Sequence, residues 1–206
     1  MLFRSAGVHL VINLAASNVL ARQINAGARV DLFISADDAQ MDAVARQLLP
    51  GTRVMLVRNQ LAVAVPRAST RSIRQVSDLL DTGVRRIALG DPESVPAGVY
   101  ARLYLERVGL WSALRPRLVP SASVRAALAS VERGAADAAF VYRTDLSAAP
   151  RARLAFVVPV DDGPPIGYPA AVVRTGHNVS GASQVLDVLR GAEALAVFRA
   201  AGFLTP

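Results

Sequence analysis

The chain has 206 residues, of which 52% are hydrophobic, and it carries a formal net charge of +7. A chain of this size can bury one or two domain cores. It contains no cysteine, which excludes disulfides, a thiolate nucleophile and cysteine-based metal sites. No run reaches the roughly 18–20 uninterrupted apolar residues that a membrane span needs, so we expect a soluble protein.

The basic residues are all arginines, and they are scattered along the chain. Their densest groups are the pairs Arg85–Arg86 and Arg115/Arg117, and few aromatic residues accompany them. Proteins that bind nucleic acids gather their cations into a patch or a stripe. We therefore expect solvated helix faces and no nucleic-acid partner.

The first residues, MLFRSAGVHLVINLAAS, combine an early arginine with an apolar middle, as secretory signals do. His9 and Asn13 interrupt that apolar run, which is rich in β-branched residues. The pattern favours a strand over residues 8–14. We accordingly expect no signal peptide within this chain.

Short apolar runs then alternate with helical patterns along the rest of the chain. Helices are predicted over residues 18–25, 37–49, 73–80, 97–108, 124–133, 181–189 and 192–201. Further strands are predicted over residues 30–35, 53–58, 61–65, 86–89, 118–119, 138–142, 154–160 and 168–173. Strands that alternate with crossover helices predict an α/β protein with mainly parallel sheets.

Two groups of long extended runs suggest that the chain builds two lobes. LAVAVP and the pair LAFVVPV/YPAAVV bracket a central block without an intervening helical pattern. We assign residues 1–62 and 166–206 to lobe I and residues 63–165 to lobe II. The hinge strands are expected near residues 61–66 and 154–173.

Three predicted turns from strand to helix are candidate anion sites. They contain Ser17–Asn18, Pro96–Ala97–Gly98, and Ser121 with Ser123 before the helix that starts at Val124. The first backbone N–H groups of a helix lack partners within it, and the helix dipole adds partial positive charge there. Such an end can bind an anion, although serines at these places are more often plain caps.

Patterns typical of catalysis are missing from the sequence. It has no GxSxG elbow, no GxGxxG fingerprint and no phosphate-binding GxxxxGK[ST] loop. His9 and His177 are far apart, and Asp161–Asp162 reads as a turn. Asp91 and Glu93 are expected to shape their own turn and to point away from any anion. We therefore predict a protein that is not an enzyme and that has no direct metal ligands.

Several segments together resemble the molybdate-binding proteins of ABC importers, the ModA family. They are SNVLARQINAGARVDLFISADDAQMD, IALGDPESVPAGVYAR, LWSALRPRLVPSASVRAALASVERGAADAAFVYRTD, YPAAVV and FRAAGF. The resemblance implies a two-lobed, type II periplasmic-binding-protein fold that closes by a hinge around molybdate or tungstate. It also implies a periplasmic location, a membrane permease as partner, a monomer, and no cofactor.

The resemblance assigns four ligand residues by position. Ser17 would contribute its hydroxyl and backbone N–H, Ala97 and Val124 their backbone N–H groups, and Tyr142 its phenolic hydroxyl. These groups would hold the oxyanion through its oxo groups. The sequence does not separate molybdate from tungstate.

The chain departs from the family pattern at its beginning. Family members have a strand, an AAAS-L-like loop with another ligand serine, and a helix ahead of VHLVINL. From this we expect an incomplete first lobe, and a chain that is less stable and binds more weakly than one extended upstream. Two alternative functions stay open: a small-anion effector domain like those of LysR-type regulators, and a sulfate-type oxyanion-binding protein.

Overall fold

The computed structural model describes residues 9–205, which form two compact units. Unit 1 contains the chain up to Arg58 and from Gly167 onward, and unit 2 contains Asn59–Ile166. The prediction about a signal peptide falls largely on residues 1–8, which lie outside the described part. None of the described helices is long and apolar enough to cross a membrane.

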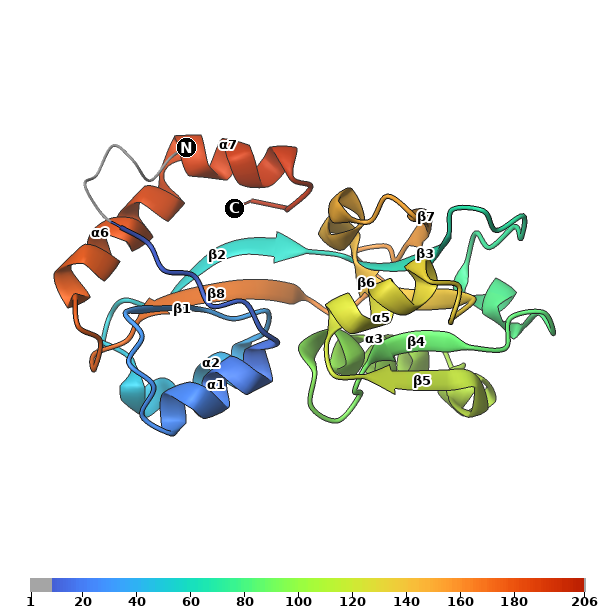
Figure 1. The fold of residues 1–206 in the computed structure, drawn as a ribbon, viewed down its shortest axis with the longest axis horizontal. Helices are drawn as coiled ribbons and strands as arrows, with labels where there is room; N and C mark the ends of the chain where they lie inside the picture. The colour runs from blue at the N-terminus through green and yellow to red at the C-terminus, as the bar shows by residue number, and fades with distance from the viewer. Residues whose placement is uncertain (1–8, 206) are drawn as a thin grey trace. The chain divides into compact units, whose positions relative to one another are not determined.

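Unit 1 is built on a three-stranded sheet with the order β1-β8-β2. The strands are β1 (Leu32–Ile34), β8 (Ile166–Val172) and β2 (Val54–Asn59). The helices are α1 (Ser17–Asn25), α2 (Asp38–Ala43), the 3-10 turn η1 (Ala45–Gln47), α6 (Val179–Arg190) and α7 (Ala192–Ala200). Alternate residues of β8 face different helices: Ala171 packs with α1 and α2, and Ala170 packs with α6 and α7. The sheet is therefore covered on both faces (Figure 1).

Unit 2 is built on a five-stranded sheet with the order β5-β4-β6-β3-β7. Its strands are β3 (Leu61–Pro66), β4 (Ile87–Gly90), β5 (Leu118–Ser121), β6 (Ala138–Tyr142) and β7 (Ala152–Val157). Its helices are α3 (Pro96–Arg107), α4 (Trp111–Leu114) and α5 (Val124–Glu132), with the 3-10 turns η2 (Val76–Leu80), η3 (Arg115–Arg117) and η4 (Arg143–Ala148). Every residue of β4 and β6 is buried, which fits strands with side chains packed on both faces.

The sheets are mixed, as predicted, but parallel pairs do not predominate among the described registers. β4 runs parallel to β5 and β6, whereas β3 runs antiparallel to β6 and β7. β3 brings the chain into unit 2 and β7 leads it back toward unit 1. Because the two strands carry the chain in opposite senses, their pairing is antiparallel.

The strand predicted over residues 8–14 is wrong for the part that the structure describes. Residues 9–16 belong to no helix or strand, and Val11 is 89% exposed. β-branched residues favour extended backbone, but a strand exists only where a neighbour shares its hydrogen bonds. In unit 1, β1 pairs with β8, and none of the strands described within residues 9–205 lies on the other side of β1.

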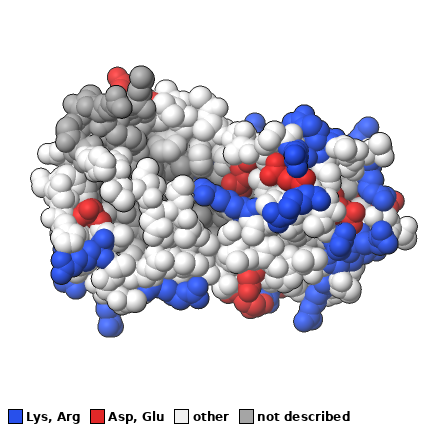
Figure 2. Space-filling view, in the orientation of Figure 1, with Lys and Arg blue, Asp and Glu red and all other residues white. Residues whose placement is uncertain are grey.

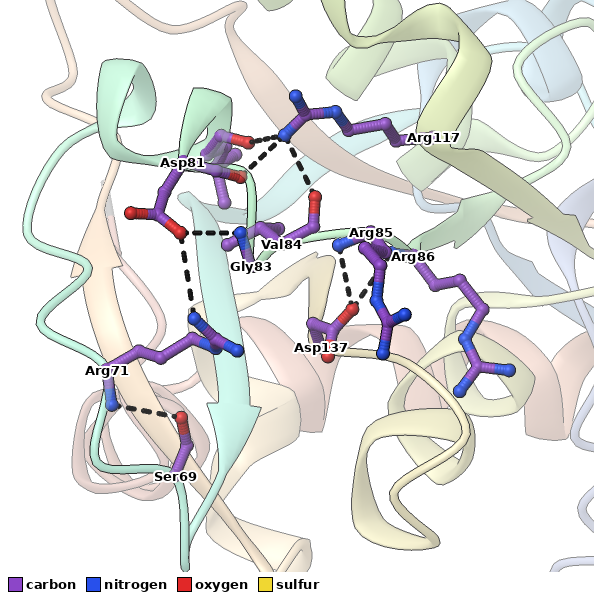
Figure 3. Close-up of polar contacts among 10 residues, drawn as sticks. Ser69, Arg71, Asp81, Gly83, Val84, Arg85, Arg86, Arg117 and Asp137 are labelled. Carbon is purple, nitrogen blue, oxygen red and sulfur yellow. Dashed lines mark hydrogen bonds and ion pairs between the residues drawn. The ribbon is translucent and has the colours of Figure 1, made fainter.

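Arg117 anchors the turn that leads into β4, as Figure 3 shows. Its Nη1 donates to three backbone carbonyl oxygens, those of Leu79, Asp81 and Val84, at 3.1, 2.7 and 2.9 Å. In the same region, Asp137 Oδ2 accepts the backbone N–H groups of Arg85 and Arg86, each at 2.9 Å. Members of both arginine pairs noted in the sequence therefore take part in holding the fold.

Candidate functional site

Three adjacent parallel strands bring three of the predicted ligand residues to one edge of the sheet in unit 2. Gly90, the last residue of β4, pairs with Ser121, the last residue of β5. The chain continues from these strands into α3 and α5, respectively, and Tyr142 is the last residue of β6. Ligands of α/β proteins bind at the carboxyl ends of the strands. The edge that holds Ala97, Val124 and Tyr142 is therefore a candidate ligand site.

Ala97 presents an unused backbone donor at the start of α3. Pro96 has no N–H, and the N–H groups of Gly98 and Val99 both donate to the carbonyl of Val95. The N–H of Ala97 donates to no acceptor within residues 9–205, although the residue is only 1% exposed. A buried backbone N–H without a partner is rare, because it costs about 1–3 kcal/mol. This group is available for a bound acceptor.

Two glycines allow the amino end of α3 to approach the end of β4. A Cβ added at Gly98 would overlap the carbonyl group of Gly90 and lie 2.7 Å from the carbonyl oxygen of Asp91. A Cβ added at Gly90 would lie 2.6 Å from Cγ1 of Val95. The two glycines of GDPESVPAG thus fix the position of the Ala97 N–H, which lies between them in the sequence.

The carboxylates of this turn are engaged locally, as predicted from the sequence. Asp91 Oδ1 accepts the backbone N–H of Glu93 at 2.8 Å, and Glu93 forms an ion pair with Arg102 on α3. Arg102 also donates to Glu106 at 2.8 Å and lies over the ring of Trp111. Both carboxylates of this turn, Asp91 and Glu93, therefore have partners within the protein.

The start of α5 offers a second set of backbone donors. Ser123 is the N-cap, and its Oγ accepts the N–H of Ala126 at 3.2 Å. The N–H groups of Val124 and Arg125 have no acceptor within the described residues. Ser123 is accordingly a plain cap, and the half-buried Val124 carries the open donor, as expected for a helix amino end.

Asp145, which the sequence analysis did not single out, orients the end of β6. Its Oδ2 accepts the backbone N–H of Tyr142 at 2.9 Å, and Tyr142 is 4% exposed. Burial raises the pKa of Asp145 from 3.8 to about 6, and the Tyr142 hydrogen bond and the charge of Arg125 oppose that shift. The signal in the sequence was an aspartate three residues beyond the strand, which is the spacing of a capping residue.

Ser17 is the predicted ligand residue in unit 1, and it begins α1. It is 7% exposed, and its Oγ accepts the backbone N–H of Ala36 at 2.9 Å. A hydroxyl that accepts one bond keeps its own proton to donate. The backbone N–H groups of Ser17 and Asn18 also have no acceptor within the described residues, since Val19 and Leu20 use the carbonyl of Ala16.

The loop after β1 contacts the amino end of α1 through the Ala36 N–H and then begins α2. Asp37, the N-cap of α2, accepts the N–H of Gln40 at 2.8 Å and is 8% exposed. Burial raises the pKa of Asp37, and the hydrogen bonds from Gln40 and Ser35 oppose that shift. Its carboxylate is thus committed to the amino end of α2, where the helix dipole stabilises negative charge.

The remaining candidates from the sequence do not converge on a second site. His9 is exposed, and the exposed His177 lies with its Nε2 3.4 Å from Nη1 of Arg29. Within residues 9–205 no group of three His, Asp or Glu side chains could hold a metal ion. Figure 2 shows arginines spread over the visible face with carboxylates among them.

Comparison with known proteins gives one consistent family. The profile of the bacterial extracellular solute-binding proteins matches residues 4–204. The molybdate-binding protein ModA of Escherichia coli (strain K12) is 41% identical over 208 residues, which cover 97% of this chain and 80% of that protein. The molybdate-binding protein ModA of Haemophilus influenzae is 32% identical over 202 residues, covering 94% of this chain and 78% of that protein.

Solved structures agree with this result. The periplasmic molybdate-binding protein of Azotobacter vinelandii matches with a TM-score of 0.87 and 27% identity, covering 98% of this chain and 90% of that one. The sulfate-binding protein SubI of Mycobacterium tuberculosis has a TM-score of 0.83 at 17% identity, covering 96% of this chain and 76% of that one, which shows the fold alone. These likenesses confirm the predicted type II periplasmic-binding-protein fold. Together with the 41% identity, they show that the chain belongs to the bacterial extracellular solute-binding proteins, in the ModA family of molybdate-binding proteins.

Proposed function

We propose that this protein is the solute-binding component of an ABC importer and binds molybdate or tungstate. The observation that carries the proposal is the N–H of Ala97, which is buried, points out of the amino end of α3 and has no acceptor within the described residues. Relatives that are up to 41% identical bear the name molybdate-binding protein.

The proposed ligands are Ser17 from unit 1 and Ala97, Val124 and Tyr142 from unit 2. Three of them lie at helix amino ends, and three lie at the carboxyl edge of the sheet in unit 2. All are neutral donors. A hydrogen bond from a neutral donor to a charged acceptor contributes about 1.5–3 kcal/mol, so a few such bonds in fixed positions can hold a dianion without an ion pair.

Neutral donors also suit a protein that must release its ligand. An arginine or lysine in contact with the anion would add strong attraction that release to a permease would have to overcome. We accordingly propose a monomer that closes around the oxyanion and delivers it to a membrane permease from the extracytoplasmic side. The same donors would select by size, because donors placed for molybdate leave the smaller sulfate with unmade hydrogen bonds.

Isothermal titration calorimetry of the purified chain with molybdate, tungstate, sulfate and phosphate tests this function. We expect saturable one-to-one binding of molybdate and tungstate, with sulfate and phosphate at least about tenfold weaker. Tighter binding of sulfate would replace the proposal by a sulfate-binding function. The absence of heat and of a shift in melting temperature with all four anions would reject oxyanion binding.

A further inference from the structure

Asn18 is a buried polar residue without a partner beside the proposed ligand Ser17. It is 8% exposed, and its Oδ1 is buried with no hydrogen-bond donor. Its Nδ2 does not share that full burial, and it has no acceptor within the described residues. The contrast within α1 is direct, since Asn25 near the other end donates its Nδ2 to the carbonyl of Ala43 at 2.9 Å.

A carboxamide with a buried, unpartnered atom lowers the stability of the folded protein unless a ligand supplies the missing hydrogen bond. A buried polar group without a hydrogen bond destabilises the folded protein, because its interactions with water are lost and not replaced. Alanine or leucine would fill the same helix position and would form the helix at least as readily. Asn18 is buried, so contact with water does not explain a polar residue at this position of α1.

The position of Asn18 directs its side chain toward the amino end of α1. It is the second residue of the helix, and the Cα–Cβ bonds of a helix tilt toward its amino terminus. The unused backbone N–H groups of Ser17 and Asn18 open at the same end. Helix geometry therefore directs the carboxamide toward the end where these donors are open, which is also the end that attracts negative charge.

Rotation of the carboxamide by 180° exchanges Oδ1 and Nδ2 and turns the buried position into a donor. The terminal torsion of asparagine is broad, so either orientation is accessible. With Nδ2 inward, the side chain adds an N–H donor to those of the first turn. With Oδ1 toward the anion, the partial negative charge of the carbonyl oxygen would repel a dianion. Binding would therefore favour the orientation that points Nδ2 toward the anion.

We propose that Asn18 is a further oxyanion ligand, which donates through Nδ2 to the anion bound by Ser17. This inference rests on the proposed function, and it names the chemical form of the ligand. An N–H donor bonds more strongly to an oxygen that shares negative charge than to one that keeps a proton, so Asn18 favours fully ionised tetrahedral dianions over oxyanions that keep a hydroxyl.

Calorimetric titration with molybdate tests Asn18→Ala against two comparison variants. Asn18→Asp keeps the shape but replaces the donor by a negative charge, and Asn25→Ala removes a carboxamide from the other end of the same helix. We expect Asn18→Ala to bind about 10- to 100-fold more weakly than the parent chain, which is the loss of one donor to a charged acceptor. Asn18→Asp should bind more weakly still, and Asn25→Ala should bind as the parent does.

Thermal melting without ligand separates this role from a structural one. Because the buried carboxamide has no partner, Asn18→Ala should melt at the same temperature as the parent chain or above it. A lower melting temperature with unchanged molybdate affinity would assign Asn18 to the fold and overturn the proposal. Unchanged affinity in Asn18→Asp would overturn it as well.

Failure of the Asn18 proposal can be distinguished from failure of the proposed function. If the parent chain binds no oxyanion, the proposed function fails and the inference fails with it. If the parent binds molybdate and Ser17→Ala weakens binding while Asn18→Ala does not, the function stands and Asn18 is not a ligand.

Discussion

Gly98 and Gly90 pack so closely that a Cβ added at Gly98 would overlap the carbonyl group of Gly90. The contact joins the first turn of α3 to the last residue of β4. It therefore fixes where the N–H of Ala97 emerges. The sequence GDPESVPAG reads as a chain turn with a helix start, but its two glycines are also required by a backbone contact across that turn.

Gly98→Ala should destabilise the protein, because the added methyl group meets backbone atoms that cannot rotate away. Overpacking of this kind costs about 1–3 kcal/mol, and it should also weaken oxyanion binding by displacing Ala97. Urea denaturation followed by circular dichroism measures the first effect and titration the second. Gly163→Ala is the milder comparison, since its Cβ would lie 3.2 Å from Cγ1 of Val158 and 3.3 Å from the carbonyl oxygen of Pro159, so its neighbours need to shift far less. Equal unfolding midpoints for Gly98→Ala and the parent chain would contradict the packing argument.

Ser17→Ala should weaken molybdate binding about tenfold or more, because it removes a hydroxyl donor to a charged acceptor. The same change also removes the acceptor of the Ala36 N–H. Ser112→Ala removes an exposed hydroxyl on α4 and serves as the matched control. An unchanged titration for Ser17→Ala would remove Ser17 from the site.

Asp145 should make stability depend on pH in the mildly acidic range. Its pKa is raised from 3.8 to about 6, so the folded protein holds this proton more tightly than the unfolded chain does. The resulting stabilisation is complete below pH 4 and is lost as the pH rises through 6.

Asp145→Asn removes that dependence while keeping an acceptor for the N–H of Tyr142. At pH 7 the variant should exceed the parent chain in unfolding free energy by about 1–3 kcal/mol, and the difference should vanish near pH 4. Urea denaturation at a series of pH values from 4 to 7 measures it. Asp187→Asn on the exposed face of α6 controls for the removal of one carboxylate. A difference that grows toward low pH would mean that the sign is wrong.

Arg117→Ala should destabilise unit 2 by about 2–3 kcal/mol, because three carbonyl oxygens lose a charged donor. Arg115→Ala, two residues away and exposed, should have little effect. Thermal melts of both variants compare them directly. Because the anchored turn precedes β4 and contributes no proposed ligand, molybdate affinity of the folded Arg117→Ala protein should match that of the parent chain.

Helices and strands of unit 2 could be predicted from the sequence because their signals are local. The apolar runs IALG and AAFVY end where turn residues begin, and β6 spans the predicted residues 138–142. Residues 9–16 show the limit of the same reasoning. Their composition suits a strand, but strand formation depends on a neighbour far away in sequence. The single helix predicted over 37–49 likewise divides into α2 and η1.

The sequence by itself determined the family, the α/β character and, to within one residue, the helix starts at Ser17, Pro96 and Val124, because motifs, periodicity and caps are properties of contiguous residues. Only the tertiary structure decided which donors stay unused. Whether the N–H of Ala97 or the carboxamide of Asn18 finds a partner depends on the groups that folding brings around it. The close contact of Gly90 with Gly98 was decided in the same way, by packing that no local pattern encodes.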